Sequence, residues 1–238
     1  MCDPVDASAY AFTQGLRSTR SALVTWRRRP WAVLRTWLLG SLATAAVLLM
    51  AIWLIAVIRS GSELGVRPSQ PPFVVGGTGD VARILIHNLL VLALHAMACV
   101  AGFIAGSSLP LQASYQTGLN RVVHERGRPI AMACVVGATS FSLSMQAYSL
   151  GTGTAQVAAG LHVAPGLVLL GLLPHAVPEL AALFLPLAAW IIASRRREWD
   201  QLLAATIVTV SLAVPTLVLA ALWEVYVAPH VLAALLGY

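Results

Sequence analysis

The stretch from residue 163 to residue 194, VAPGLVLLGLLPHAVPELAALFLPLAAWIIAS, constrains the fold of this chain more than any other. It is apolar and long, yet four prolines interrupt it. One straight helix over it would run roughly 45 Å, whereas the hydrocarbon core of a bilayer is about 30 Å thick. Because proline removes a backbone donor and clashes with the preceding turn, we expect a helix break at Pro174 and Pro178, within LPHAVPEL.

Two arrangements of this stretch stay open: one broken crossing, or a re-entrant piece followed by a full span. In either case, non-helical backbone at membrane depth must be covered by protein or by water. His175 and Glu179 lie in the middle of the stretch. A charged carboxylate at mid-bilayer costs about 2.5 to 3.5 kcal/mol, so Glu179 must be protonated, paired or wetted.

The composition predicts an integral membrane protein. The chain has 238 residues, 58% of them hydrophobic and only 10% charged, against about 25% charged in an average soluble domain. The net charge of +6 does not indicate nucleic-acid binding, because the arginines cluster beside apolar spans. The cysteines form neither a disulfide framework nor a zinc spacing, so we expect no cofactor and no metal.

The apolar runs predict an all-α fold, a polytopic transmembrane helix bundle with about five crossings, one of them Pro-broken or re-entrant, and short interfacial helices. The expected spans are residues 37–58, 84–107, 130–150, 163–194 and 202–227. We expect residues 1–36 to form a basic, amphipathic cytoplasmic segment and residues 37–238 to form the bundle. Small residues between the third span and the long stretch, at 151–160, suggest a loop.

The arginines predict the orientation. With five crossings, twelve of the fifteen basic residues fall on one side: six before the first span, three within 109–129 and three at 195–197. Positive charge marks the cytoplasmic side. We therefore expect the N-terminus in the cytoplasm and the C-terminus outside.

The second span carries a narrow stripe of polar and small residues. At 100° per residue, Asn88, His95, Cys99, Gly102 and Gly106 share one face, while large apolar residues cover the others. That face should contact protein. The GxxxG pair formed by Gly102 and Gly106 is typical of close helix packing.

We predict that the buried polar side chains form an intramembrane centre consisting of His175, Glu179, Asn88, His95 and Glu224. Two interpretations of this centre stay open. The side chains either satisfy backbone groups freed by the helix break, or form a protonatable or solute-contacting centre. Two ligands four residues apart, without HEXXH, make an incomplete metal site, so no enzyme is expected.

Several motifs together resemble the stage II sporulation protein M family of bacterial membrane proteins. They are His87-Asn88, the pair Gly102 and Gly106, LPHAVPEL at 173–180 and WEVYVAP at 223–229. The resemblance covers residues 80–229. The sequence departs from the family pattern at Ala176, where the family favours Gly, and at His87, where it favours Asn.

The resemblance implies a role in the bacterial envelope, where the founding member is a scaffold that positions peptidoglycan-degrading enzymes. We therefore expect a multi-pass protein of the bacterial inner membrane, a structural subunit that assembles other envelope membrane proteins within the lipid bilayer. The alternative is a transporter or channel subunit with a polar centre at the broken helix. Homo-oligomerisation stays open.

Overall fold

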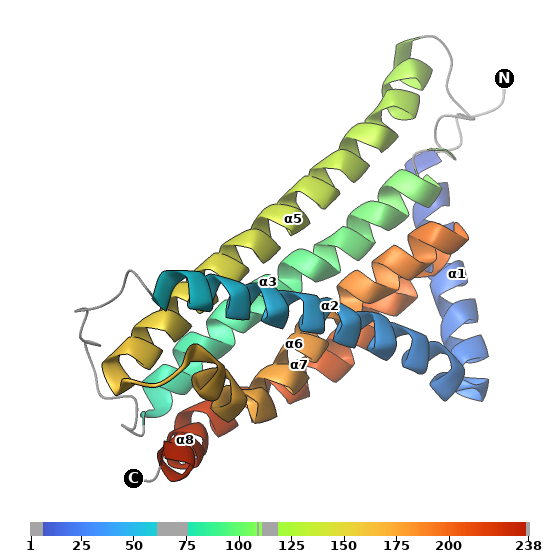
Figure 1. Cartoon of the computed structure of the whole chain (residues 1–238). Coiled ribbons are helices and arrows are strands. Elements are labelled where there is room, and N and C mark those ends of the chain that lie inside the picture. Colours follow the sequence, from blue (N-terminus) through green and yellow to red (C-terminus); the bar gives the residue numbers. More distant parts are fainter. Residues whose placement is uncertain (1–6, 61–75, 109, 111–118, 237–238) are drawn as a thin grey trace, which may run out of the picture. The chain divides into compact units, whose positions relative to one another are not determined.

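The computed structural model describes residues 7–60, 76–108, 110 and 119–236, and Figure 1 shows its ribbon. Residues 1–6, 61–75, 109, 111–118 and 237–238 lie outside the described residues, and they include Cys2 and part of the polar sequence on either side of the second predicted span. The described elements are helices: α1 Ala7–Arg28, α2 Pro30–Ser60, α3 Thr78–Phe103, η1 Ile104–Ser108, α5 Leu119–Leu161, α6 Pro165–Arg196, η2 Trp199–Gln201, α7 Leu202–Tyr226 and α8 Ala228–Leu236. No strand occurs among them.

Within the described residues, five helices are long and apolar enough to cross a membrane. They are Pro30–Ser60, Thr78–Ser108, Pro129–Leu161, Pro165–Arg196 and Trp199–Tyr226. The predicted all-α polytopic bundle with about five crossings is therefore confirmed. Each observed span is longer than its predicted counterpart or nearly equal to it, because the helices continue past the strictly apolar residues.

The chain divides into two compact units, and each of the five membrane-length helices contributes residues to both. Unit 1 comprises Met1–Gly40, Leu92–Thr139 and Leu185–Ser211. Unit 2 comprises Ser41–Val91, Ser140–Phe184 and Leu212–Tyr238.

Unit 1 has a small core built around an aromatic residue. Trp37, Leu185, Ala189 and Ala205 form a buried cluster, and Trp26 meets Trp37 edge to face with ring centroids 5.1 Å apart. Such edge-to-face pairs add to the stabilisation that burial of the rings already gives. The start of α2 is thereby tied to the second half of α6 and the first turns of α7.

The helix α1 also belongs to unit 1, and small residues form its buried face. Gly15, Thr19 and Ala22 are buried, whereas Leu16 is exposed. A Cβ atom on Gly15 would lie 2.7 Å from the Phe103 ring. The N-terminal segment is therefore a packed helix whose small-residue face touches the end of α3.

Unit 2 is held together by close approaches between helices. The hydroxyl of Ser41 on α2 donates a hydrogen bond to the carbonyl of Ala181 on α6. A Cβ on Gly151 of α5 would lie 2.8 Å from Ile55 of α2. Glycine at this position lets the two backbones come close enough for dispersion contacts that a larger side chain would prevent.

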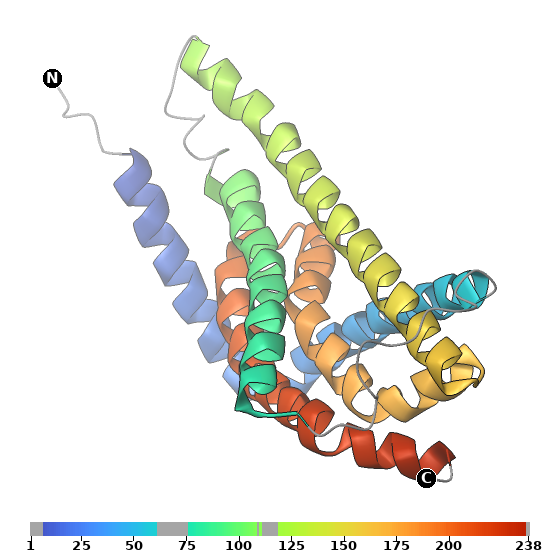
Figure 2. The same ribbon diagram turned by 90° about the vertical axis from the view of Figure 1, so that its left-hand side faces the viewer.

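The C-terminal helix α8 packs against the beginning of α6 within the same unit (Figure 2). A Cβ on Gly171 would lie 2.9 Å from Leu232 Cδ1, and both Ala228 and Leu232 are buried. The helix α8 thus has one buried face.

The predicted helix break in the long apolar stretch is wrong, because α6 is one continuous helix from Pro165 to Arg196 (Figure 1). Its length of about 48 Å at 1.5 Å per residue exceeds a hydrocarbon core, so its ends extend beyond that core or the helix tilts. Pro174 and Pro178 each remove one backbone donor, but both rings lie on an exposed face of α6. Membrane helices tolerate such prolines when the remaining backbone bonds and neighbouring groups keep the turn intact.

The loop expected at 151–160 is also wrong, because α5 continues to Leu161 (Figure 2). The small residues in this part serve packing, since Gly151, Ala155 and Ala158 are buried. The helix ends at His162, which has a positive φ of 57°. The Val163 amide then donates to the Ala158 carbonyl over 3.0 Å, which is the bond of a Schellman cap.

Candidate functional site

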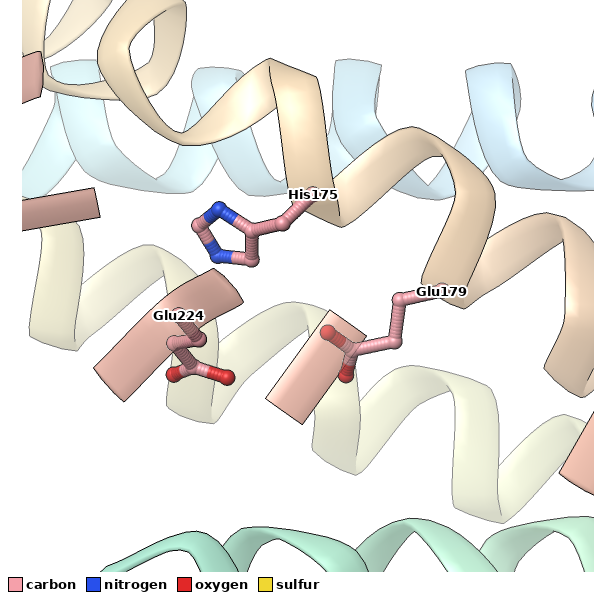
Figure 3. Close-up of side chains that lie close together, drawn as sticks. All are labelled: His175, Glu179 and Glu224. Atoms are coloured by element: carbon pink, nitrogen blue, oxygen red, sulfur yellow. The ribbon is translucent and has the colours of Figure 1, made fainter. Parts of the chain in front are cut away.

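His175, Glu179 and Glu224 form a compact polar cluster in unit 2. The helix α6 carries His175 and Glu179 one turn apart, so both side chains project from the same face. Glu224 comes from the last turn of α7. One ligand atom from each residue lies within 4.8 Å of the others, and Figure 3 shows the imidazole and the two carboxylates around one space.

The imidazole of His175 is the most buried member of this cluster. Its residue is 5% exposed, and among the described residues its Nδ1 atom has no hydrogen-bond partner. Glu179 and Glu224 are half-buried. A buried polar atom without a partner costs free energy, so this nitrogen is a place where a further ligand would be stabilising.

Asn88 of α3 completes the cluster. Its residue is 5% exposed, and its Nδ2 donates a hydrogen bond to Glu179 Oε1 over 2.8 Å. The amide fixes one oxygen of the carboxylate and leaves the other free for a further partner. Four side chains from three helices thus converge within a single unit.

The negative charge of the two carboxylates in the cluster is not balanced by a basic side chain in the membrane parts of the helices that carry them. The sequence has no Arg or Lys within 84–107, 165–194 or 202–226, the membrane parts of the three helices that carry the site. Two carboxylates that approach within 4.8 Å repel each other strongly where water is scarce. A bound cation, a shared proton or local water must relieve that repulsion.

The structure brings four of the five predicted centre residues together and leaves out the fifth. His95 is fully buried, but it lies in unit 1 and is not one of the clustered residues. Pro174 and Pro178 flank His175 on the adjacent, exposed face of α6. They therefore shape the turn that carries the site without lining it.

The two glycines of the GxxxG pair pack within unit 1. A Cβ on Gly102 would lie 2.7 Å from Trp190 Nε1 and 2.8 Å from Leu202 Cδ1. A Cβ on Gly106 would overlap the ring of Trp199. Both glycines thus give room to tryptophan rings of the same chain.

Ser41 was not among the residues predicted for the site. Its hydroxyl donates a hydrogen bond to the carbonyl of Ala181, two residues after Glu179. The residue is fully buried. The available signal was a Gly-Ser pair within an otherwise apolar span, which is typical of a close helix crossing.

The helix α5 presents a different candidate surface. It is the least apolar of the five spans, and only 11% of its apolar part is buried, against 61% for α6. Gly137, Ser140, Ser144 and Tyr148 are exposed and follow one another at helical spacing on one face. A Cβ on Gly137 would meet no atom within 4 Å.

Comparisons of the chain with protein-family models, with curated proteins and with solved structures gave no match. The resemblance to the stage II sporulation protein M family stays a prediction from the motifs in the sequence. Function is therefore inferred from the polar cluster and from the exposed face of α5.

Proposed function

We propose that this protein is a structural subunit in the bacterial inner membrane and that it holds partner proteins of the cell envelope in place. One observation carries this proposal: the exposed face of α5 formed by Gly137, Ser140, Ser144 and Tyr148. The motifs that resemble the stage II sporulation protein M family support the envelope location. The distribution of arginines supports a cytoplasmic N-terminus and an external C-terminus.

The chemistry of this face favours protein over lipid. Helix interfaces in membranes are enriched in Gly, Ala, Ser and Thr, because small residues let two backbones approach closely. The Ser144 hydroxyl donates to the Ser140 carbonyl over 2.9 Å, so it is satisfied within its own helix. The face can therefore pack against an apolar partner helix without leaving that donor unpaired.

A photo-crosslinking amino acid placed at Ser144 in the native host tests the proposal. We expect a discrete crosslinked product, and mass spectrometry after mild-detergent purification identifies the partner. Leu90 of α3, which is 68% exposed, is the matched lipid-facing control and should give no such product. Equal labelling at both positions, or labelling of lipid alone at Ser144, contradicts the proposal.

A second candidate function is that of a transporter or channel subunit, and the His175, Glu179 and Glu224 cluster is the observation that favours it. Ionisable groups inside membrane bundles are typical of ion and solute pathways. Solute or ion flux in liposomes, lost in a Glu179→Gln variant, would support this function. Absence of flux together with a partner crosslink at Ser144 would exclude the transporter function and support the scaffold function.

A further inference from the structure

We propose that His175, Glu179 and Glu224 bind one divalent transition-metal cation, and that Asn88 orients the Glu179 carboxylate toward it. The inference goes beyond the scaffold function and does not depend on it. It rests on a cluster in unit 2, whereas the scaffold function rests on the exposed face of α5.

The donor set determines the class of cation. One imidazole nitrogen and two carboxylate oxygens, without a thiolate, suit zinc and other first-row transition metals such as manganese or iron(II). Calcium and magnesium prefer sites made of oxygen alone. Three protein ligands leave a fourth position for water, as in zinc sites that keep an open coordination position.

The geometry of the cluster is close to that of a bound site. The ligand atoms of the three residues already lie within 4.8 Å of one another. Donors around a tetrahedral zinc at about 2.1 Å are roughly 3.4 Å apart. Glutamate side chains rotate about three bonds, so the approach of the oxygens of Glu179 and Glu224 to a cation requires rotation of side chains and not movement of helices.

The buried imidazole of His175 provides a ligand of a different kind from the acidic groups. His175 is 5% exposed and its Nδ1 has no hydrogen-bond partner among the described residues. Imidazole nitrogens are common metal ligands when neutral. Figure 3 shows the other ring nitrogen, Nε2, on the side of the two carboxylates. That nitrogen is therefore the one that would bind a cation in the space between the three residues, and Nδ1 is left for a partner outside that space.

Charge balance favours a divalent ion. Two carboxylates and a neutral imidazole carry a charge of about −2, which a divalent cation cancels, and a neutral site is the least costly in hydrocarbon. The membrane parts of α3, α6 and α7 offer no Arg or Lys for this purpose. A monovalent cation would leave one charge uncompensated.

Asn88 has the position of an outer partner. Its Nδ2 bond of 2.8 Å to Glu179 Oε1 holds one carboxylate oxygen and so limits rotation of the carboxylate beside the cluster. Such partners orient metal-binding carboxylates, and their loss typically lowers metal affinity about 10-fold to 100-fold.

The test uses the full chain, purified in mild detergent through a tag without histidine and stripped with EDTA. After addition of ZnCl₂ and gel filtration, plasma mass spectrometry should find about one zinc per chain. We expect His175→Gln, Glu179→Gln and Glu224→Gln each to weaken zinc binding tenfold or more. His87→Gln, at the exposed residue next to Asn88, is the matched control and should bind as the wild type does.

A second measurement guards against variants that fail to fold. ZnCl₂ should raise the melting temperature of the stripped wild-type protein, because a ligand that binds only the folded state stabilises it. This measurement on the wild-type protein therefore tests the proposal even where a variant does not fold. Zinc content near zero in the wild type, as expected if protons alone neutralise the cluster, overturns the proposal. Retention of zinc by a folded Glu179→Gln, Glu224→Gln double variant overturns it equally.

Discussion

Asn88 Nδ2 donates a hydrogen bond to Glu179 Oε1 across 2.8 Å and so joins α3 to α6, 91 residues apart in the sequence. The Asn88 side chain is buried, which excludes much of the water that would otherwise compete for the bond. Interhelical hydrogen bonds in membranes stabilise by about 0.6 kcal/mol on average and by up to about 1.7 kcal/mol. This bond involves a carboxylate, which places it toward the upper part of that range.

A double-mutant cycle between Asn88→Ala and Glu179→Ala should therefore give a coupling free energy of about 1 to 2 kcal/mol. The measurement is reversible unfolding in mixed micelles containing EDTA, so that no metal contributes. Asn88→Ala combined with Thr216→Ala is the control, since the Thr216 hydroxyl bonds the Leu212 carbonyl within its own helix. Additive effects for the first pair would show that the bond does not form.

Gly102→Ala should lower the free energy of unfolding by about 1 to 3 kcal/mol, because its methyl group would lie 2.7 Å from Trp190 Nε1. Gly137→Ala is the matched control. The methyl group added at residue 137 would meet no atom within 4 Å. This variant should be neutral or stabilising by up to about 1 kcal/mol, because alanine has a higher helix propensity than glycine. Thermal unfolding in detergent measures both. Equal melting temperatures for the two variants would contradict the close packing at Gly102.

His162 and Arg197 end α5 and α6 with positive φ values of 57° and 59°. A left-handed backbone costs a non-glycine residue about 1 to 2 kcal/mol, and glycine relieves most of that cost. We therefore expect His162→Gly and Arg197→Gly each to raise stability by about 0.5 to 1 kcal/mol. Ala138→Gly, inside α5 and exposed, should instead lower it by about 1 kcal/mol. Destabilisation by His162→Gly would show that its imidazole makes contacts that outweigh the strain.

The five spans predict which ends of the helices face which side of the membrane. Single cysteines at Met1, Arg121 and Arg197 should react with an impermeant thiol reagent only after the cells are opened. Cysteines at His162, Val75 and Tyr238 should react in intact cells. The background lacks the native cysteines. Labelling of position 197 from outside would overturn the five-crossing orientation.

The spans could be predicted from the sequence because each apolar run of 18 or more residues has few stable alternatives in a bilayer. The continuity of α6 could not be predicted from the sequence. Pro174 and Pro178 are helix breakers by local chemistry, but whether a helix continues through them depends on neighbouring elements that local sequence does not reveal. The same limit applies to 151–160, where small residues fit a loop and a packed helix equally well.

The polar centre was predictable in part, for a geometric reason. The stripe on α3 shows that Asn88 and His95 face protein, yet seven residues separate them by about 10 Å along the helix. Only one of them can therefore meet Glu179, and periodicity does not say which. Glu224 was predicted as part of the centre, but it lies 45 positions beyond Glu179 in the sequence, so only the packing of α7 shows that it lies within 4.8 Å of His175 and Glu179.

Glu179 is the residue at which shape and charge can be separated. Glu179→Gln keeps the side-chain length and an oxygen that can accept from Asn88 Nδ2, while it removes the charge. Glu179→Leu keeps the approximate volume but leaves the Asn88 amide buried without its partner, which costs about 1 to 3 kcal/mol. In EDTA we therefore expect the Gln variant to melt like the wild type and the Leu variant to melt at a clearly lower temperature.

The same pair of variants then assigns the role of the carboxylate. If Glu179 serves only to hold α3 against α6 through Asn88, the Gln variant should keep its partner crosslink at Ser144 and complement a deletion strain fully. If its charge is needed, the folded Gln variant should lose zinc stabilisation together with growth complementation or flux. We expect the second outcome, because two carboxylates and a buried imidazole with ligand atoms within 4.8 Å of one another exceed what one hydrogen bond between two helices requires. A fully active, zinc-free Gln variant would leave Glu179 with the structural role alone.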